Sequence, residues 1–185
     1  DPQSSGGSHG IHVGSTIAAL NDGNNINGFG IAVVPMRVMG TSGTGFVSDI
    51  AQGLLFAGGL PNSTGSVYQG ASPIKVMNLS LGSIGGGCSS TYQGVFNDLY
   101  DRNISIVSSS GNAAQESPGQ YGWPASCENV ISVGATDVTR TRAYYSTYND
   151  AVDIAAPGGD ITVDVNADGF SDGVLAFDSD EDLSF

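Results

Sequence analysis

The stretch ISIVSSSGN, residues 104–112, joins a short β-branched run to small polar residues, a glycine and an asparagine. A short apolar run of this kind is typical of a strand that is buried on both faces of a sheet. Glycine and asparagine are favoured in turns, so the strand is expected to end at its serines. The stretch therefore predicts a buried parallel strand with a loop at its carboxyl end.

Four further runs share this length and composition. They are IAVVPMRVM (31–39), PIKVMNLSL (73–81), NVISVGAT (129–136) and AVDIAAP (151–157). Segment 90–102 places apolar residues at helical spacing, and segment 48–58 is also expected to be helical. Strands that alternate with helices predict an α/β fold with a mostly parallel sheet.

Composition favours one globular domain. The chain has 185 residues, 39% of them hydrophobic, which is enough for a core. No apolar run approaches the length that spans a bilayer, so no membrane partner is expected. The net charge of −13, with only five Lys and Arg residues, argues against nucleic acid as a partner, because phosphate neutralisation supplies most of that affinity. Residues 160–185 hold eight of the eighteen acidic residues and are either solvated or a cation site.

The two cysteines, Cys88 and Cys127, lie far apart and form no C-x-x-C pattern. A zinc site is therefore not expected. Their spacing is compatible with two free thiols or with one disulfide. The low lysine content and the many small polar residues favour an exported protein, in which a disulfide persists.

The residues that follow the expected strands are glycine-rich and uncharged. Ligands of open parallel sheets bind beyond the carboxyl ends of the strands. No G-K-[ST] pattern occurs there, which disfavours a nucleotide-binding domain. Glycine lets another backbone approach closely, which suits an extended peptide that adds as a strand. Asn112 offers an amide donor of the kind that an oxyanion hole needs, and a simple turn asparagine is the alternative.

Both histidines lie in SHGIHVGSTIAAL, residues 8–20, where small residues surround them. His9 and His12 are three residues apart, at the start of an expected helix that could pack in the interior. A metal pair would need a third ligand from Asp or Glu, and no neighbouring motif offers one. A catalytic base and a histidine outside the chemistry are the two remaining interpretations.

Seven segments, in this order, resemble the subtilisin-like serine proteases, the subtilases. They are HGIHVGSTIAAL, GIAVVPMRVMG, SDIAQGLLFAGG, KVMNLSLGS, ISIVSSSGN, NVISVGATD and YSTYNDAVDIAAPGG. The resemblance covers almost all of residues 8–159, and it is closest to secreted bacterial members that carry P-A-x-C before a V-I-x-V-x-A-T strand. It implies a three-layer fold, with the sheet between helices, and hydrolysis of polypeptides through a serine.

The resemblance also implies roles for single residues. His9 matches the catalytic general base, and His12 matches a second histidine that supports the structure. Asn112 matches the oxyanion-hole donor. Cys88 and Cys127 match a disulfide of this branch.

Three groups of residues match the substrate cleft of the family. One side of the cleft corresponds to Ser80, Leu81 and Gly82. The wall of the primary specificity pocket corresponds to Ser109, Ser110 and Gly111. The edge strand that pairs with the substrate corresponds to Gly43, Thr44 and Gly45. The family's usual alanines are replaced by Ser109 and Ser110, which predicts a more polar pocket wall.

Two motifs of the family are missing, D-[TS]-G before the histidine and G-T-S-x-A after the A-P-G strand. Asp1 lies only eight residues before His9, and we do not take it as the triad acid. The sequence is therefore expected to be the central part of a secreted bacterial endopeptidase, incomplete in its fold. Residues 1–159 would belong to the peptidase domain and residues 160–185 would form an acidic insertion or tail. The chain alone is expected to be inactive and monomeric and to need no organic cofactor.

The acidic segment contains DVNADGFSD, residues 164–172, which fits the first nine positions of an EF-hand-like calcium loop. The ligand oxygens would come from Asp164, Asn166, Asp168 and Asp172. The twelfth position is Leu175, so a bidentate carboxylate would have to come from Asp178, Asp180 or Glu181. A structural calcium site and a solvated acidic loop are both open.

A function of another class remains open as well. A degenerate subtilase-like domain could serve as a calcium-dependent binding or structural module. The calcium-like loop and the missing triad partners favour this function. If D-[TS]-G and G-T-S-x-A are found in the flanking sequence, they favour the peptidase.

Overall fold

The computed structural model describes residues 8–23, 26–177 and 183–184. Contacts between residues divide the chain into two compact units, one of Asp1–Gly53 with Gly173–Phe185 and one of Leu54–Asp172. The expected boundary after residue 159 stays a prediction.

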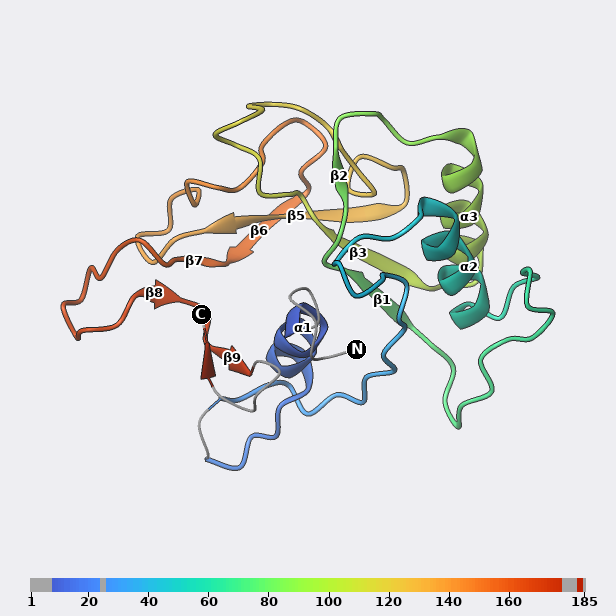
Figure 1. Cartoon of the computed structure of the whole chain (residues 1–185), viewed down its shortest axis with the longest axis horizontal. Helices are drawn as coiled ribbons and strands as arrows, with labels where there is room; N and C mark the ends of the chain where they lie inside the picture. Colours follow the sequence, from blue (N-terminus) through green and yellow to red (C-terminus); the bar gives the residue numbers. More distant parts are fainter. Residues whose placement is uncertain (1–7, 24–25, 178–182, 185) are drawn as a thin grey trace. The chain divides into compact units, whose positions relative to one another are not determined.

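A four-stranded sheet forms the centre of the unit Leu54–Asp172 (Figure 1). Its strands are, in spatial order, β1 (Val76–Leu79), β3 (Ser105–Ser109), β5 (Val130–Thr136) and β6 (Ile154–Pro157). All three neighbouring pairs are parallel, and the register places Leu79 beside Ser108 and Ser109 beside Val133. The carboxyl ends of the strands therefore meet along one edge. This sheet confirms the α/β class and four of the five expected strands. The expected burial on both faces is wrong for β6, whose four residues are exposed at the edge of the sheet.

The helix α3 (Ser90–Asp101) packs against β3. Its apolar stripe is buried, and Phe96 and Leu99 are fully so. The Ser89 hydroxyl caps its first turn by accepting from the Tyr92 N–H at 3.5 Å. The carboxyl-terminal part of α2 (Val47–Ala57) lies beside α3, and a Cβ at Gly58 would meet the Leu99 side chain. Both expected helices are confirmed.

Short ladders join the loops of the same unit. The strand β2 (Ser83–Ile84) pairs antiparallel with β4 (Gly122–Trp123). The peptide bond between Trp123 and Pro124 is cis. Beyond β6, β7 (Gly159–Asp160) pairs with β8 (Asp172–Gly173). The ladder of β2 and β4 connects the segment after β1 to the segment before β5.

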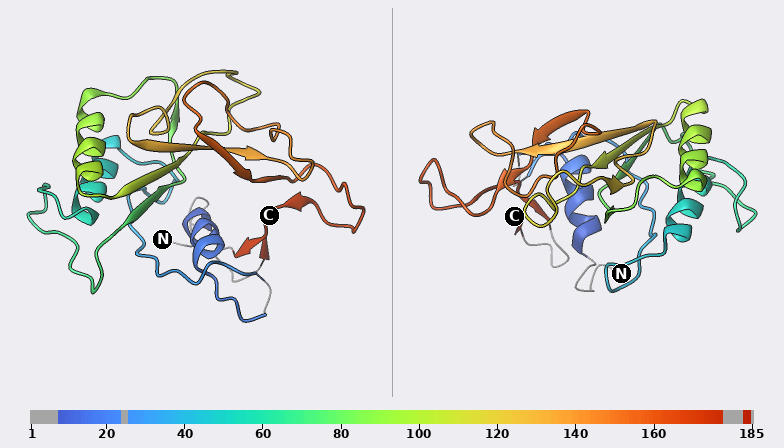
Figure 2. Two further views of the ribbon diagram at one scale, coloured as in Figure 1. Left: turned by 180° about the vertical axis from the view of Figure 1, so that it is seen from behind. Right: turned by 90° about the horizontal axis from the view of Figure 1, so that it is seen from above.

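The other unit contains α1 (Ser8–Ala18), β9 (Ala176–Phe177) and β10 (Leu183–Ser184). Both views in Figure 2 show α1 beside β9. The Phe177 N–H donates to the Ser15 hydroxyl at 3.0 Å. The Gly28 N–H donates to Ala19 O at 3.0 Å, so the chain after α1 folds back on the end of the helix. The small residues of α1 predict a helix that packs in the interior. In the structure His9 is exposed, so the helix is less buried than expected.

The expected strand at 31–39 is not found. Among the described residues this segment has no ladder partner, and Ile31, Val33 and Met36 are exposed. A β-branched run becomes a strand only where another strand accepts its hydrogen bonds, so sequence propensity alone was insufficient here. Within the described part of the chain, no helix has the length and hydropathy needed to cross a membrane.

Candidate active site

A pocket of about 260 Å³ lies at the carboxyl ends of the four parallel strands. Residues from all four strands or the loops after them line it, as expected for a ligand site of an open parallel sheet. Among those residues are Asn78, Ser80, Ser109, Ser110, Gly111, Asn112, Ala135, Pro157 and Gly158. The structure thus brings together predicted cleft residues from two segments about thirty positions apart.

The loop after β3 carries Asn112. Gly111 has a φ of +104°, a conformation that side chains rarely allow. The Ser110 N–H donates to Val133 O at 2.9 Å, which ties the start of the loop to β5. Asn112 itself is exposed and lines the pocket. The geometry is compatible with a donor that points into a cleft, and the oxyanion role stays a prediction.

The segment after β1 forms a second side of the pocket. The Asn78 amide donates to the Ser80 hydroxyl at 3.0 Å. The Ser108 hydroxyl donates to Leu79 O at 3.2 Å and links β3 to β1. A Cβ at Gly82 would lie only 2.4 Å from Trp123 O, so this position has no room for a side chain.

The pocket wall is less polar than the two serines suggest. The Ser110 hydroxyl is buried and donates to Thr147 O at 3.0 Å, so it is occupied within the protein. Ser109 is exposed. The expected polarity of the wall therefore depends on Ser109.

The two histidines lie on α1, in the other unit. His9 is in the first turn of the helix, and His12 is partly buried one turn later. The hydroxyls of Ser15 and Thr16 donate to His12 O at 3.0 and 3.1 Å. The roles assigned to His9 and His12 stay predictions, since Asn112 belongs to the unit Leu54–Asp172.

The predicted substrate-pairing residues Gly43, Thr44 and Gly45 follow a turn. The Gly40 N–H donates to Thr44 O at 2.8 Å, and the hydroxyls of Ser42 and Thr44 lie 2.7 Å apart. These residues are not part of an assigned strand. Their pairing with a substrate stays a prediction.

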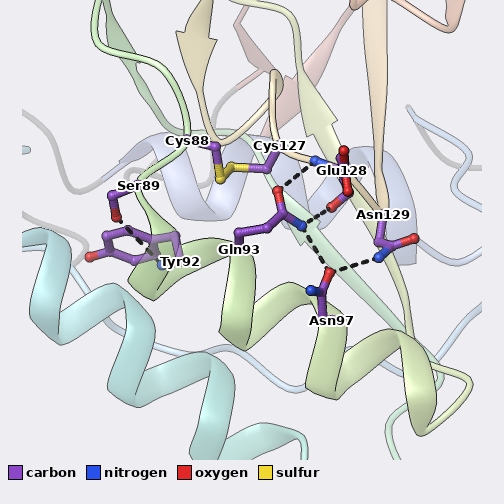
Figure 3. Close-up of a disulfide and its surroundings, with 8 residues drawn as sticks. All are labelled: Cys88, Ser89, Tyr92, Gln93, Asn97, Cys127, Glu128 and Asn129. Carbon is purple, nitrogen blue, oxygen red and sulfur yellow. Dashed lines mark hydrogen bonds between the residues drawn. A yellow bond between two sulfur atoms is a disulfide. The ribbon is translucent and has the colours of Figure 1, made fainter.

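The disulfide between Cys88 and Cys127 is present, with the Cα atoms 5.1 Å apart (Figure 3). Beside it, Gln93 on α3 both accepts from the Glu128 N–H and donates to Glu128 O, each at 2.9 Å. The Asn97 side chain accepts from Gln93 and from Asn129, also at 2.9 Å. The disulfide and these amides fasten the first turns of α3 to the chain that enters β5.

The calcium-like loop is held by its own side chains. Asp164 accepts from the N–H groups of Asp168 and Gly169, and Asp172 accepts from the Val165 N–H. Among the described residues, no three His, Cys, Asp or Glu side chains are placed as a metal site requires. Asp178, Asp180 and Glu181, named as further ligands, lie outside the described residues. Calcium binding therefore stays a prediction.

A second hollow, of about 470 Å³, lies next to the disulfide. Gly85, Gly86, Gly119 and Tyr121 are among the residues that line it. The Tyr121 hydroxyl donates to the Asp150 carboxylate, and this hydrogen bond raises the pKa of Tyr121. The hollow contains none of the predicted cleft residues, so we take the smaller pocket at the strand ends as the candidate site.

Sequence reasoning singled out neither Asn78, which lines the pocket, nor Thr147, which lies behind it. The signal for Asn78 was a polar residue inside an apolar run. Thr147 contacts the loop that carries Asn112. It lies inside one of the segments that carry the family resemblance, but no motif singles it out.

Several known proteins are similar to this chain in sequence. Residues 1–179 match the Subtilase family. The chain is 38% identical over 171 residues to an extracellular protease of Xanthomonas campestris, covering 90% of this chain and 28% of that protein. It is 40% identical over 157 residues to Subtilisin Savinase of Lederbergia lenta, covering 83% of this chain and 51% of that protein.

Solved structures point the same way. A structure of proteases from Pseudoalteromonas arctica matches with a TM-score of 0.75 and 36% identity, covering 89% of this chain and 47% of that chain. The chain thus spans between about a quarter and a half of the length of these relatives.

Proposed function

Because the chain belongs to the subtilase family of serine peptidases, we propose that it forms the central part of a secreted bacterial endopeptidase. The observation that carries the proposal is the pocket at the strand ends, which gathers Ser80 and the segment Ser109–Asn112. The names of the relatives, which include an extracellular protease, support secretion and a polypeptide substrate.

In this proposal the reaction is acyl transfer to a serine. His9 takes the proton from the serine hydroxyl as it attacks the scissile carbonyl, and later gives it to the leaving amine. Asn112 donates to the oxyanion that forms, and removal of one such donor costs about 3 kcal/mol of transition-state stabilisation. The segments Ser80–Gly82 and Gly43–Gly45 hold the peptide backbone as an added strand.

The serine and the triad aspartate are supplied from outside these 185 residues, since neither family motif occurs in the sequence. The chain alone is therefore inactive, because an imidazole without its nucleophile has nothing to activate. We further propose that Asp164, Asn166, Asp168 and Asp172 hold a structural calcium ion, with a carboxylate beyond the loop completing the site.

A fluorophosphonate probe tests the proposal directly. The full-length protein that carries this chain is expected to label on one serine, and the 185-residue chain is expected not to label. The variant His9→Ala should abolish labelling, while the matched variant His12→Ala should retain it. A labelled serine in the 185-residue chain would overturn the proposed inactivity. An unlabelled full-length protein would favour the rival function, a degenerate binding or structural module.

A further inference from the structure

We propose that Thr147 is a positioning residue that holds Asn112 in the orientation needed at the oxyanion hole, an inference that rests on the proposed function. Thr147 is 4% exposed and lies between β5 and β6 in the chain. It touches neither the substrate nor the reacting atoms in the mechanism above. Its influence would pass through the loop that carries Asn112.

Three polar atoms of Thr147 bind the chain on both sides of Asn112. The Thr147 N–H donates to Gly111 O at 2.9 Å, and its Oγ1 accepts from the Ala113 N–H at 3.0 Å. Its carbonyl oxygen accepts from the Ser110 hydroxyl at 3.0 Å. The backbone is thereby fixed immediately before and immediately after the proposed donor.

The local backbone does not hold this shape by its own preference. Gly111 has a φ of +104°, in a region that only glycine visits readily and from which it can also depart. A Cβ at Gly111 would lie 3.1 Å from Thr147 Oγ1, so Thr147 packs closely against this glycine. The conformation before Asn112 therefore depends on bonds from outside the loop.

These bonds are shielded from water. Ser110 and Ala113 are as deeply buried as Thr147, whereas Asn112 between them is exposed in the pocket. If the Thr147 hydroxyl is removed, a buried N–H of Ala113 loses an acceptor that water cannot easily replace. The loop would move to satisfy that N–H, and Asn112 would move with it.

The test is steady-state peptide hydrolysis by the full-length protein. Thr147→Val keeps the shape of the side chain and removes the acceptor, and it should lower kcat by about 10-fold to 100-fold, the order seen for small misplacements. The KM should stay nearly unchanged, because Asn112 acts mainly in the transition state. Thr147→Ser restores the hydroxyl and should restore kcat. Thr139→Val, an exposed threonine whose hydroxyl bonds to Asp137, is the matched control and should keep wild-type kcat.

A double-mutant cycle separates positioning from general destabilisation. In the Asn112→Ala background, adding Thr147→Val should cause no further loss of kcat. If the kcat losses of Asn112→Ala and Thr147→Val multiply in the double variant, or if Thr147→Val keeps the wild-type kcat, the role of Thr147 is overturned. If Thr147→Val fails to fold, Ser110→Ala removes one of the three bonds and should show a smaller loss with the same non-additivity. A wild-type protein that neither hydrolyses peptides nor reacts with the fluorophosphonate probe would overturn the proposed function, and this role with it. An active wild type in which the two kcat losses multiply would overturn the role of Thr147 alone.

Discussion

At the scale of single residues, hydroxyl groups organise the proposed cleft. The Ser108 hydroxyl donates to Leu79 O, and the Ser146 hydroxyl accepts from the Ala135 N–H at 2.9 Å. Both serines are almost fully buried, where hydrogen bonds are shielded from competing water. The serines at the end of β3 were predictable from sequence, whereas Ser146, in the loop between β5 and β6, was not. The bonding partners of Ser108 and Ser146 were not predictable, since they lie as far as 29 positions away in the chain.

Asp137 provides a prediction about pH. Its carboxylate accepts from the N–H and the hydroxyl of both Thr139 and Thr141 at 2.7–3.0 Å, and the two hydroxyl bonds are the largest cause of its lowered pKa. Because these bonds favour the ionised form, they stabilise the fold above the pKa of the unfolded chain, and the stabilisation is lost as pH falls through the lower, folded-state pKa. Asp137→Ala should therefore lower Tm at neutral pH. In thermal scans, the gap in Tm to the wild type should shrink as the solution is acidified.

The variant Asp137→Asn is the control for charge. It keeps an acceptor oxygen but does not titrate, so its Tm should also approach that of the wild type in acid. A Tm gap that stays constant between neutral and acid pH, for either variant, would contradict the assignment of the lowered pKa to these bonds.

Gly82 provides a prediction about packing. A Cβ there would lie 2.4 Å from Trp123 O, a backbone atom that cannot rotate away. Gly82→Ala should lower the free energy of unfolding by about 1–3 kcal/mol, as overpacking does elsewhere. Urea unfolding measures the change. Gly87→Ala is the matched control, because a Cβ at Gly87 meets nothing within 4 Å; equal effects of the two variants would show that the close contact is not the cause.

At the scale of elements, the runs that pair within the sheet were predicted correctly, both at its centre and at its edges. The runs around β1, β3, β5 and β6 became strands because each finds a parallel neighbour. The run at 31–39 has similar β-branched residues but no ladder in the described chain. Sequence records the propensity of a segment, whereas a strand also needs a partner for its backbone, which the segment itself does not reveal.

The disulfide should matter for the stability of α3 and its surroundings. It closes a loop between residues separated by 39 positions. Chain entropy predicts a stabilisation of about 4 kcal/mol for a loop of this size. The double variant Cys88→Ala with Cys127→Ala should therefore show a clearly lower Tm and urea midpoint. Gln93→Ala, which removes the neighbouring amide bonds and keeps the disulfide, should cost about 1–2 kcal/mol. An equal loss for both would show that the disulfide adds little.

The calcium-like loop gives a prediction about ligand binding. If Asp168 helps to hold a calcium ion, calcium at one hundred times its Kd should raise the free energy of unfolding of the wild type by about 2.7 kcal/mol. The Tm of the wild type should therefore rise with calcium. Asp168→Ala should lose this shift. Asp101→Ala removes an acidic residue elsewhere and should keep it. Differential scanning fluorimetry with calcium, magnesium and chelator measures the effect, and an equal calcium shift in Asp168→Ala and the wild type would exclude the loop as the site.

At the scale of the whole molecule, the candidate site could be predicted only in part. Of the predicted cleft residues in the unit Leu54–Asp172, Ser80 and the segment Ser109–Asn112 line one pocket, whereas Leu81 and Gly82 do not. Thr147 could not be predicted, because its proposed role depends on three hydrogen bonds to the loop that carries Asn112 rather than on a motif. The proposed function therefore rests on the family pattern, whereas the contacts that support the loop carrying Asn112 are visible only in the fold.

The balance of charge and exposed apolar surface predicts how the chain associates. Phe29 and Phe46 are 82% and 77% exposed, and further apolar side chains lie along 31–36. At pH 7 the net charge of −13 keeps copies apart, and this repulsion vanishes near the pI of about 4.1. Light scattering should therefore report a monomer at pH 7 and growing particles near pH 4, with added salt promoting association at neutral pH. The double variant Phe29→Ser with Phe46→Ser has the same charge and should scatter less near pH 4. If both proteins scatter equally there, while circular dichroism shows both still folded, exposed apolar surface is not what drives association.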